Sequence, residues 1–146
     1  MTATMRVKIL KRAILPPCLL ILGCSSDGHT PTAPALTRRT IASGTYSATA
    51  HTSHFISFST PGFGQLSVTV SWRDASDTLW VDVSPSCTSD QYVAGACPFV
   101  YSDRTLVATA QKAPTINSIA AGNYVLIVDN RGPADETVTY AIDLTS

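Results

Sequence analysis

The chain has 146 residues, with ten basic and ten acidic side chains and a formal net charge of zero. This length allows one domain with a modest hydrophobic core. The zero charge hides an asymmetry, because four basic residues precede residue 24 and every acidic residue follows it. Residues 24–146 therefore carry a net charge of −4, which argues against the basic surface that binding to nucleic-acid phosphates requires.

A basic segment opens the chain and an apolar run follows it. Residues 6–12 contain four Lys and Arg side chains, residues 13–22 are apolar, and Gly23 precedes Cys24. The run is about half of the ~20 residues that a transmembrane helix needs. Residues 21–24, Ile-Leu-Gly-Cys, resemble the lipobox of a bacterial lipoprotein signal peptide.

The resemblance implies that residues 1–23 are a cleaved signal peptide and that Cys24 carries the acyl chains. Several acyl chains anchor a protein stably, whereas one chain does so only marginally. In such lipoproteins an Asp after the Cys favours retention in the inner membrane, and here that residue is Ser25. We therefore expect anchoring in the outer membrane. A secretory signal without lipidation and a buried core helix are the alternatives.

Residues 24–39 are rich in Ser, Thr, Pro and Ala and show no apolar periodicity. Such a composition cannot bury enough surface to offset the entropy of ordering. We expect a flexible linker there, followed by one domain over residues 40–146.

Two cysteines remain beyond the lipobox, Cys87 and Cys97. An even number of cysteines in an exported chain favours a disulfide, which would close a loop of about eleven residues. Two free thiols are the main alternative. A zinc site has less support, since no other Cys or His lies at ligand spacing.

Alternation of apolar and polar residues dominates from residue 41 onward, as in antiparallel strands with one dry face. The alternating segments are 56–59, 66–72, 79–83 and 138–144. Residues 124–128 are apolar without a break, which indicates a strand covered on both faces. Residues 105–110 are expected to form a further strand, and no segment shows helical periodicity. The sequence predicts an all-β, two-sheet antiparallel sandwich of seven or eight strands.

Four segments carry a resemblance to a known family: residues 64–72, 77–81, 121–128 and 137–142. Together they resemble the bacterial pre-peptidase C-terminal domain over residues 41–146. The resemblance implies a jelly-roll-like sandwich that binds substrate or matrix, or assists secretion. Two departures are a loop over residues 84–101, which looks like an insertion, and the absence of a preceding peptidase in this chain.

Trp80 is the principal candidate for a binding site. It alternates with Leu79 and Val81, so it is predicted to face away from the core, where it could stack on a sugar or anchor a peptide. Tyr92 and Tyr101 are candidate neighbours, as is Phe99. The alternative is that Trp80 packs beneath the 84–101 loop. Trp72 is assigned to the core.

Metal sites have weaker support. Asp74 and Asp77 are candidate calcium ligands, because hard cations prefer several oxygens in a flexible loop. Turn formation is the simpler interpretation of both. His51 and His54 would point to opposite faces of a strand, so a shared metal is not expected.

The sequence contains no nucleophile-elbow, zinc-protease or phosphate-loop signature, so we expect no enzyme. The leading hypothesis is a membrane-anchored, non-catalytic binding or accessory module of the cell envelope, engaging protein, peptide or glycan. The alternative is a structural envelope lipoprotein that assembles with an outer-membrane protein. No cofactor is expected apart from the possible calcium.

Overall fold

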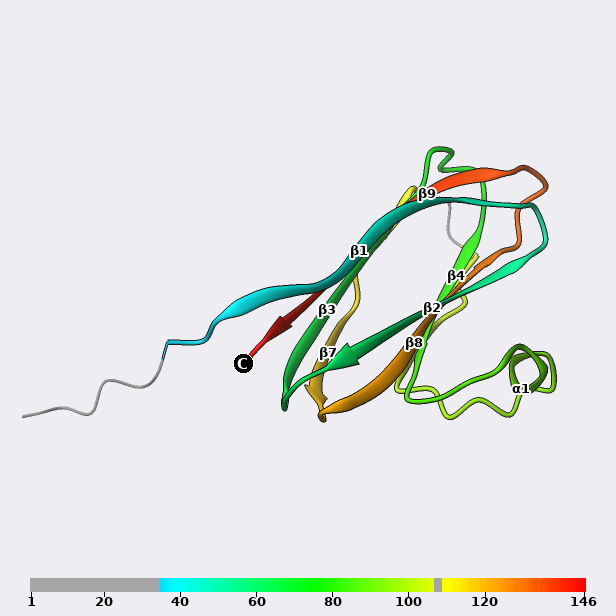
Figure 1. Ribbon diagram of the computed structural model, residues 1–146. Coiled ribbons are helices and arrows are strands. Elements are labelled where there is room, and N and C mark those ends of the chain that lie inside the picture. The colour runs from blue at the N-terminus through cyan, green and yellow to red at the C-terminus, as the bar shows by residue number, and fades with distance from the viewer. Residues whose placement is uncertain (1–34, 107–108) are drawn as a thin grey trace, which may run out of the picture. The chain divides into compact units, whose positions relative to one another are not determined.

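The computed structural model describes residues 35–106 and 109–146. Within them, the chain forms nine strands and one short helix (Figure 1). The elements are β1 (Arg38–Ala48), β2 (Ser53–Thr60), β3 (Gly64–Ser71), β4 (Leu79–Ser84), α1 (Ser89–Val93), β5 (Tyr101–Asp103), β6 (Gln111–Lys112), β7 (Thr115–Ile119), β8 (Gly122–Asn130) and β9 (Glu136–Thr145).

The strands form two antiparallel sheets that face each other (Figure 1). One sheet has the order β1-β9-β3-β6, with β7 also pairing with β3, and the other has the order β2-β8-β4-β5. Most successive strands therefore lie in opposite sheets, which is the connectivity of a jelly roll. The predicted all-β sandwich is confirmed, with nine strands rather than seven or eight because β6 and β7 are two short pieces beside β3.

The side chains that alternate along the strands fill the space between the sheets. Leu66, Val68 and Val70 of β3 are at most 1% exposed, and Trp72 follows them into the core as predicted. Complete burial of such an aliphatic side chain contributes about 1.5–3 kcal/mol. Other members of this core are Leu79, Val81, Val83, Tyr124, Leu126, Val128, Val138, Ile142 and Leu144.

The unbroken apolar run at residues 124–128 lies in β8, between β2 and β4. Tyr124, Leu126 and Val128 face the main core, whereas Val125 and Ile127 pack in a second cluster on the opposite face. The prediction of a strand covered on both faces is confirmed. The cover on the second face comes from the chain's own 84–101 loop.

One local prediction, the strand at residues 105–110, was wrong. The described part of segment 105–110 contains no strand; the chain pairs instead at β5 and β6, on either side of it. The loop after β4 contains helix α1. This helix is about one turn long, so it leaves no visible helical periodicity in the sequence. A capping box starts this helix, because Thr88 and Gln91 bond reciprocally to each other's backbone N–H.

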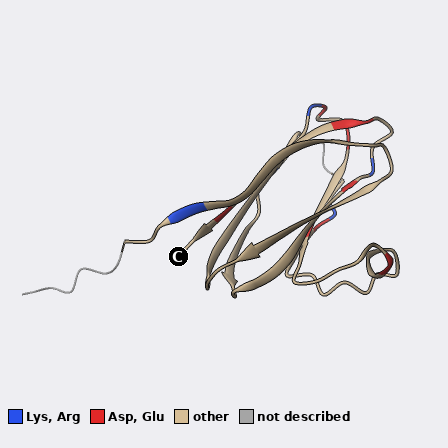
Figure 2. Ribbon diagram, viewed as in Figure 1, with Lys and Arg blue, Asp and Glu red and all other residues tan. Residues whose placement is uncertain are grey.

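Charged residues are sparse along the ribbon (Figure 2). Arg38 and Arg39 lie at the start of β1. Thr37, just before β1, exchanges two backbone hydrogen bonds with Ser146, so the segments that enter and leave the sandwich are paired with each other. Throughout the described residues, we find no helix with the length and apolar character needed to cross a membrane.

Candidate ligand-binding face

The outer face of the β2-β8-β4-β5 sheet carries polar side chains in adjacent rows. Trp80 of β4 lies opposite Asp129 of β8. In the next row, Asp82 lies between Ile127 of β8 and Ser102 of β5. Opposite residues of neighbouring strands share a face, and the residues alternating with Trp80 and Asp82 point into the core. These side chains therefore leave the sheet on the side away from the core, as predicted for Trp80.

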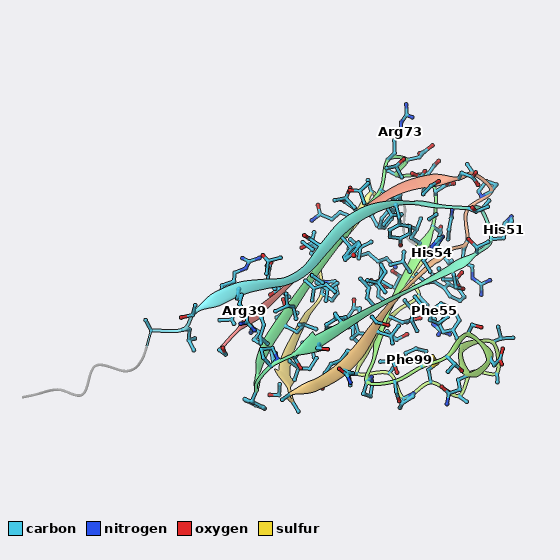
Figure 3. The ribbon with its side chains drawn as sticks, viewed as in Figure 1. Arg39, His51, His54, Phe55, Arg73 and Phe99 are labelled. Atoms are coloured by element: carbon cyan, nitrogen blue, oxygen red, sulfur yellow. A yellow bond between two sulfur atoms is a disulfide. The ribbon has the colours of Figure 1, made fainter. Side chains whose placement is uncertain are left out.

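The 84–101 loop folds over part of this face and carries α1 (Figure 1). A disulfide between Cys87 and Cys97, whose Cα atoms are 5.3 Å apart, closes the loop, so the predicted bond is confirmed. The loop buries Ile127 completely. The half-buried side chains around this second cluster are Phe55, Tyr92, Phe99 and Val125. Figure 3 shows Phe55 and Phe99 on the side of the sheet that carries α1.

Tyr92 links α1 to two buried carboxylates. Its hydroxyl oxygen lies 3.1 Å from Asp82 Oδ2 and 3.2 Å from Asp129 Oδ2. Asp82 is fully buried and Asp129 is 2% exposed. Burial raises the pKa of Tyr92 well above its usual value, and the negative charges of Asp82 and Asp129 raise it further. The hydroxyl therefore keeps its proton at neutral pH and acts as a donor.

Arg104 neutralises Asp82 and lies among three aromatic rings. Its Nη2 and Nε donate to Asp82 Oδ2 over 3.1 and 3.2 Å. The guanidinium carbon lies 5.2 Å from the ring centroid of Trp80, 5.2 Å from that of Tyr92 and 4.9 Å from that of Phe99. Burial acts to lower the pKa of Arg104, but the hydrogen bonds and charge of Asp82 outweigh it, and the pKa is raised. This cation is therefore held permanently charged against the rings.

Arg131 pairs with Asp129, the second buried carboxylate, and lies over the Trp80 ring. Its guanidinium carbon lies 4.3 Å from the centre of the Trp80 ring, and its Nε lies 2.9 Å from Asp129 Oδ2. The backbone N–H of Arg131 donates to the carbonyl of Thr78 over 2.9 Å, which continues the β4–β8 pairing by one row. The side chain is 46% exposed, so Arg131 offers solvent a guanidinium already fixed in place.

A pocket of about 420 Å³ opens beside these groups and is called here the Trp80 pocket. Its lining comprises His51, Ser53, Trp80, Tyr92, Val93, Gly95, Arg104, Asp129 and Arg131. The indole Nε1 of Trp80 is buried and has no hydrogen-bond partner within the described residues. The indole N–H therefore does not face a ligand, and Trp80 contributes its ring carbons to the pocket.

The arrangement is suited to binding. Each buried carboxylate is engaged by a guanidinium and by the Tyr92 hydroxyl, so the carboxylates hold the cations against the rings. The pocket lining therefore combines the rings of Trp80 and Tyr92 with the guanidinium groups of Arg104 and Arg131. Such groups stack on sugars or planar side chains and donate to carbonyl, carboxylate or hydroxyl oxygens.

Of the four aromatic candidates, the structure brings Trp80, Tyr92 and Phe99 together around Arg104. Trp80 and Tyr92 both line the pocket. Tyr101 does not join them: it lies opposite Val83 in the β4–β5 pairing and packs against the main core, on the other face of the sheet. Trp80 is not among the side chains of the second cluster; its ring lies against Arg104 and Arg131 and lines the pocket together with Tyr92, Val93 and Gly95 of the 84–101 loop.

Sequence reasoning missed the four charged residues of the site, Asp82, Arg104, Asp129 and Arg131. Asp82 carried a usable signal, because it has the same strand parity as Trp80 and so shares its face. The two arginines carried none. They lie just beyond the ends of β5 and β8, and only the strand register places them beside Trp80.

Asp74 and Asp77 play different parts. Asp74 accepts hydrogen bonds from the backbone N–H and the hydroxyl of Ser76, which agrees with the turn interpretation. Asp77 is 4% exposed; burial, and then the neighbouring carboxylate of Glu136, raise the pKa of Asp77. Over residues 35–106 and 109–146, no three His, Cys, Asp or Glu side chains are grouped to hold a metal ion.

His51 and His54 do not converge on one site (Figure 3). His51 occupies the left-handed region at φ 58° in the turn before β2 and lines the Trp80 pocket. His54 lies within β2, with its ring centre 4.6 Å from that of Tyr46.

A scan of the chain against protein-family models found no match, and a search of curated proteins found no similar sequence. The likeness to the pre-peptidase C-terminal domain therefore stays a prediction. Cys24, with its predicted acylation, lies outside the described residues.

Proposed function

We propose that this chain is a lipid-anchored, non-catalytic binding module of the bacterial cell envelope, and that a protein, peptide or glycan ligand binds in the Trp80 pocket. The observation that carries the proposal is the Trp80 ring, whose centre lies 5.2 Å from the guanidinium carbon of Arg104 and 4.3 Å from that of Arg131. Both cations are held by carboxylates on a rigid sheet.

Preorganisation is the physical reason for choosing this site. A ligand that meets a rigid aromatic surface and fixed donors loses less free energy to ordering of the protein. Asp82, Asp129 and Tyr92 supply the supporting hydrogen bonds and are themselves buried or half-buried. The disulfide-closed loop keeps Tyr92 over the two carboxylates.

The sequence supports the anchoring half of the proposal. The lipobox-like residues 21–24 supply the site of acylation, and the Ser/Thr/Pro/Ala-rich stretch that follows supplies a spacer between membrane and domain. The outer membrane is the proposed location, because Ser25 follows Cys24.

The alternative of a purely structural lipoprotein rested on the apolar run at residues 124–128. That run is covered on one face by the main core and on the other by the cluster around Ile127. Since the chain covers this strand itself, the run no longer calls for a partner, and the binding module is favoured.

Binding to arrays of envelope glycans and to a random peptide library tests the proposal. Trp80→Ala should lose at least tenfold in affinity for the best array ligand, whereas Trp80→Phe, which keeps a ring, should lose less. Trp72 is the only other tryptophan, so a Trp72→Phe background reports ligand binding through Trp80 fluorescence alone. Ser47→Ala, on the distant strand β1, is the matched control. Absence of binding above background, or equal binding by Trp80→Ala, would overturn the proposal.

A further inference from the structure

The edges of the two sheets are protected to different degrees. β1 carries Arg38 and Arg39 and has a register shift between Thr40 and Ala42. β5 and β6 have three and two residues, and the β7 pairing with β3 is irregular. Charges, bulges and short length are the devices by which natural sheets keep an edge from pairing with another chain.

Strand β2 has none of these devices. Its eight residues, Ser53–Thr60, contain no Lys, Arg, Asp, Glu or Pro, and its register with β8 is unbroken. Within the part of the chain that the structure describes, β2 pairs with β8 and with no second strand. Its other edge therefore presents a regular row of backbone donors and acceptors.

The register identifies which groups face that free edge. The N–H of Asn130 donates to the carbonyl of Thr52, so the bonds from this strand to β8 are made by even-numbered residues. In an antiparallel pair the backbone groups of alternate residues point to opposite sides. Ser53, Phe55, Ser57 and Ser59 consequently direct their N–H and C=O groups outward.

We propose that this edge pairs with β2 of a second copy of the chain, antiparallel and two-fold symmetric about Ser57. Ser57 then lies opposite its own counterpart, and Phe55 of each copy lies opposite Ser59 of the other. Each outward N–H of these residues meets an outward C=O. The sheets of the two copies join into one continuous sheet.

Side-chain size and charge favour this partner. A groove of about 610 Å³ lies beside β2, and its lining includes Ser57, Ser59, Asn123 and Val125 but no charged residue. In the proposed register the half-exposed ring of Phe55 stands next to a small Ser59, at the border of the other copy's groove. A neutral lining accepts an apolar ring without desolvating a charge.

Because β2 is the one unprotected sheet edge among the described strands, the assembly is limited to two copies. An isologous two-fold interface consumes the free edge of both partners. The remaining edges carry the charges, irregular register or short length described above. Pairing therefore closes as a dimer and does not continue into a filament.

Sedimentation analysis of the purified native protein, in density-matched non-ionic detergent, tests the proposal. The wild type should have twice the mass of one chain. Ser57→Lys places two like charges opposite each other and should halve that mass. Ser47→Lys, at an exposed serine of β1, should leave the dimer intact. A wild-type monomer over the whole concentration range, or a dimer that persists in Ser57→Lys, would overturn the proposal.

Oxidative cross-linking gives a second measurement that does not depend on the folding of the Lys variant. Ser57→Cys should form a covalent dimer, because directly opposite Cα atoms in a sheet lie within disulfide range. Ser47→Cys should not. Equal cross-linking of the two variants would contradict the β2 pairing, and cross-linking of Ser57→Cys to a different protein would replace the second copy with another partner.

Discussion

The Arg131 guanidinium carbon lies 4.3 Å above the Trp80 ring, and Asp129 holds it there through a 2.9 Å contact to Nε. A cation–π contact at such a partly exposed position contributes about 0.5–1 kcal/mol. The contact is thus a minor element of stability. Its main consequence is that the indole and the guanidinium are fixed as one surface.

Arg131→Ala should lower the free energy of unfolding by about 1–2 kcal/mol, because it leaves the buried carboxylate of Asp129 without its counter-charge and with Tyr92 as its hydrogen-bond partner. It should reduce ligand affinity more than stability, because the exposed donors are lost. Arg131→Lys, which keeps the charge but not the planar donor set, should recover stability without recovering affinity. Chemical denaturation and array binding, measured on the same preparations, check this separation. Equal losses in both would point to a purely structural arginine.

Asp82→Ala should be more costly. Asp82 is fully buried and accepts from Ser102, Tyr92 and Arg104, so its removal leaves three donors without their acceptor. Breaking a fully buried pair costs about 3–5 kcal/mol, and because the Arg104 side chain is 37% exposed we expect a loss of about 2–3 kcal/mol. Urea unfolding measures the effect, with Asp90→Ala on the exposed face of α1 as the control. A loss below ~1 kcal/mol would show that the network is not coupled in this way.

Replacing Cys87 and Cys97 by serine should destabilise the domain by up to about 3 kcal/mol on the chain-entropy estimate for this loop length. The loss should be concentrated in the loop and the second cluster. Amide exchange should accelerate in α1 and β8, where the cover over Ile127 loosens, and much less in β3 and β9. Uniform acceleration across both sheets would mean that the loop and the sandwich unfold as one unit.

Two carboxylates should respond to pH in opposite directions. The pKa of Asp77 is raised in the folded state, so its contribution to stability is present below the unfolded pKa of about 4 and is lost as pH rises through the folded value. The pKa of Asp143 is lowered, first by Thr40 and then by Arg38, so its contribution is present above about 4 and is lost on acidification.

Thermal unfolding at about pH 2, pH 4 and pH 7 tests both signs, with the Asp77 effect expected between pH 4 and pH 7 and the Asp143 effect between pH 4 and pH 2. Relative to the wild type, Asp77→Asn should gain stability between pH 4 and pH 7, because it cannot ionise beside Glu136. Asp143→Asn should show a smaller acid-induced loss than the wild type. Parallel pH profiles for all three proteins would contradict the assigned shifts.

Much of the fold was predictable from local pattern. Alternation along 66–72 and 79–83 corresponds to β3 and β4, and the apolar run at 124–128 correctly marked a strand covered on both faces. The same reasoning failed for 105–110, where the described residues form no strand, and for α1, which is one turn long and starts from a cap. Short elements carry too few residues for a period to be visible.

The sequence by itself determined the class of fold, the outward face of Trp80 and the pairing of Cys87 with Cys97, because each follows from strand parity or from an even number of cysteines. Only the tertiary structure decided which side chains surround Trp80. Asp82, Asp129, Arg104 and Arg131 meet there because three strands pair in one particular register, and moving a strand by a single residue would turn its side chains to the other face. Register depends on contacts between residues distant in the chain, and no local pattern contains it.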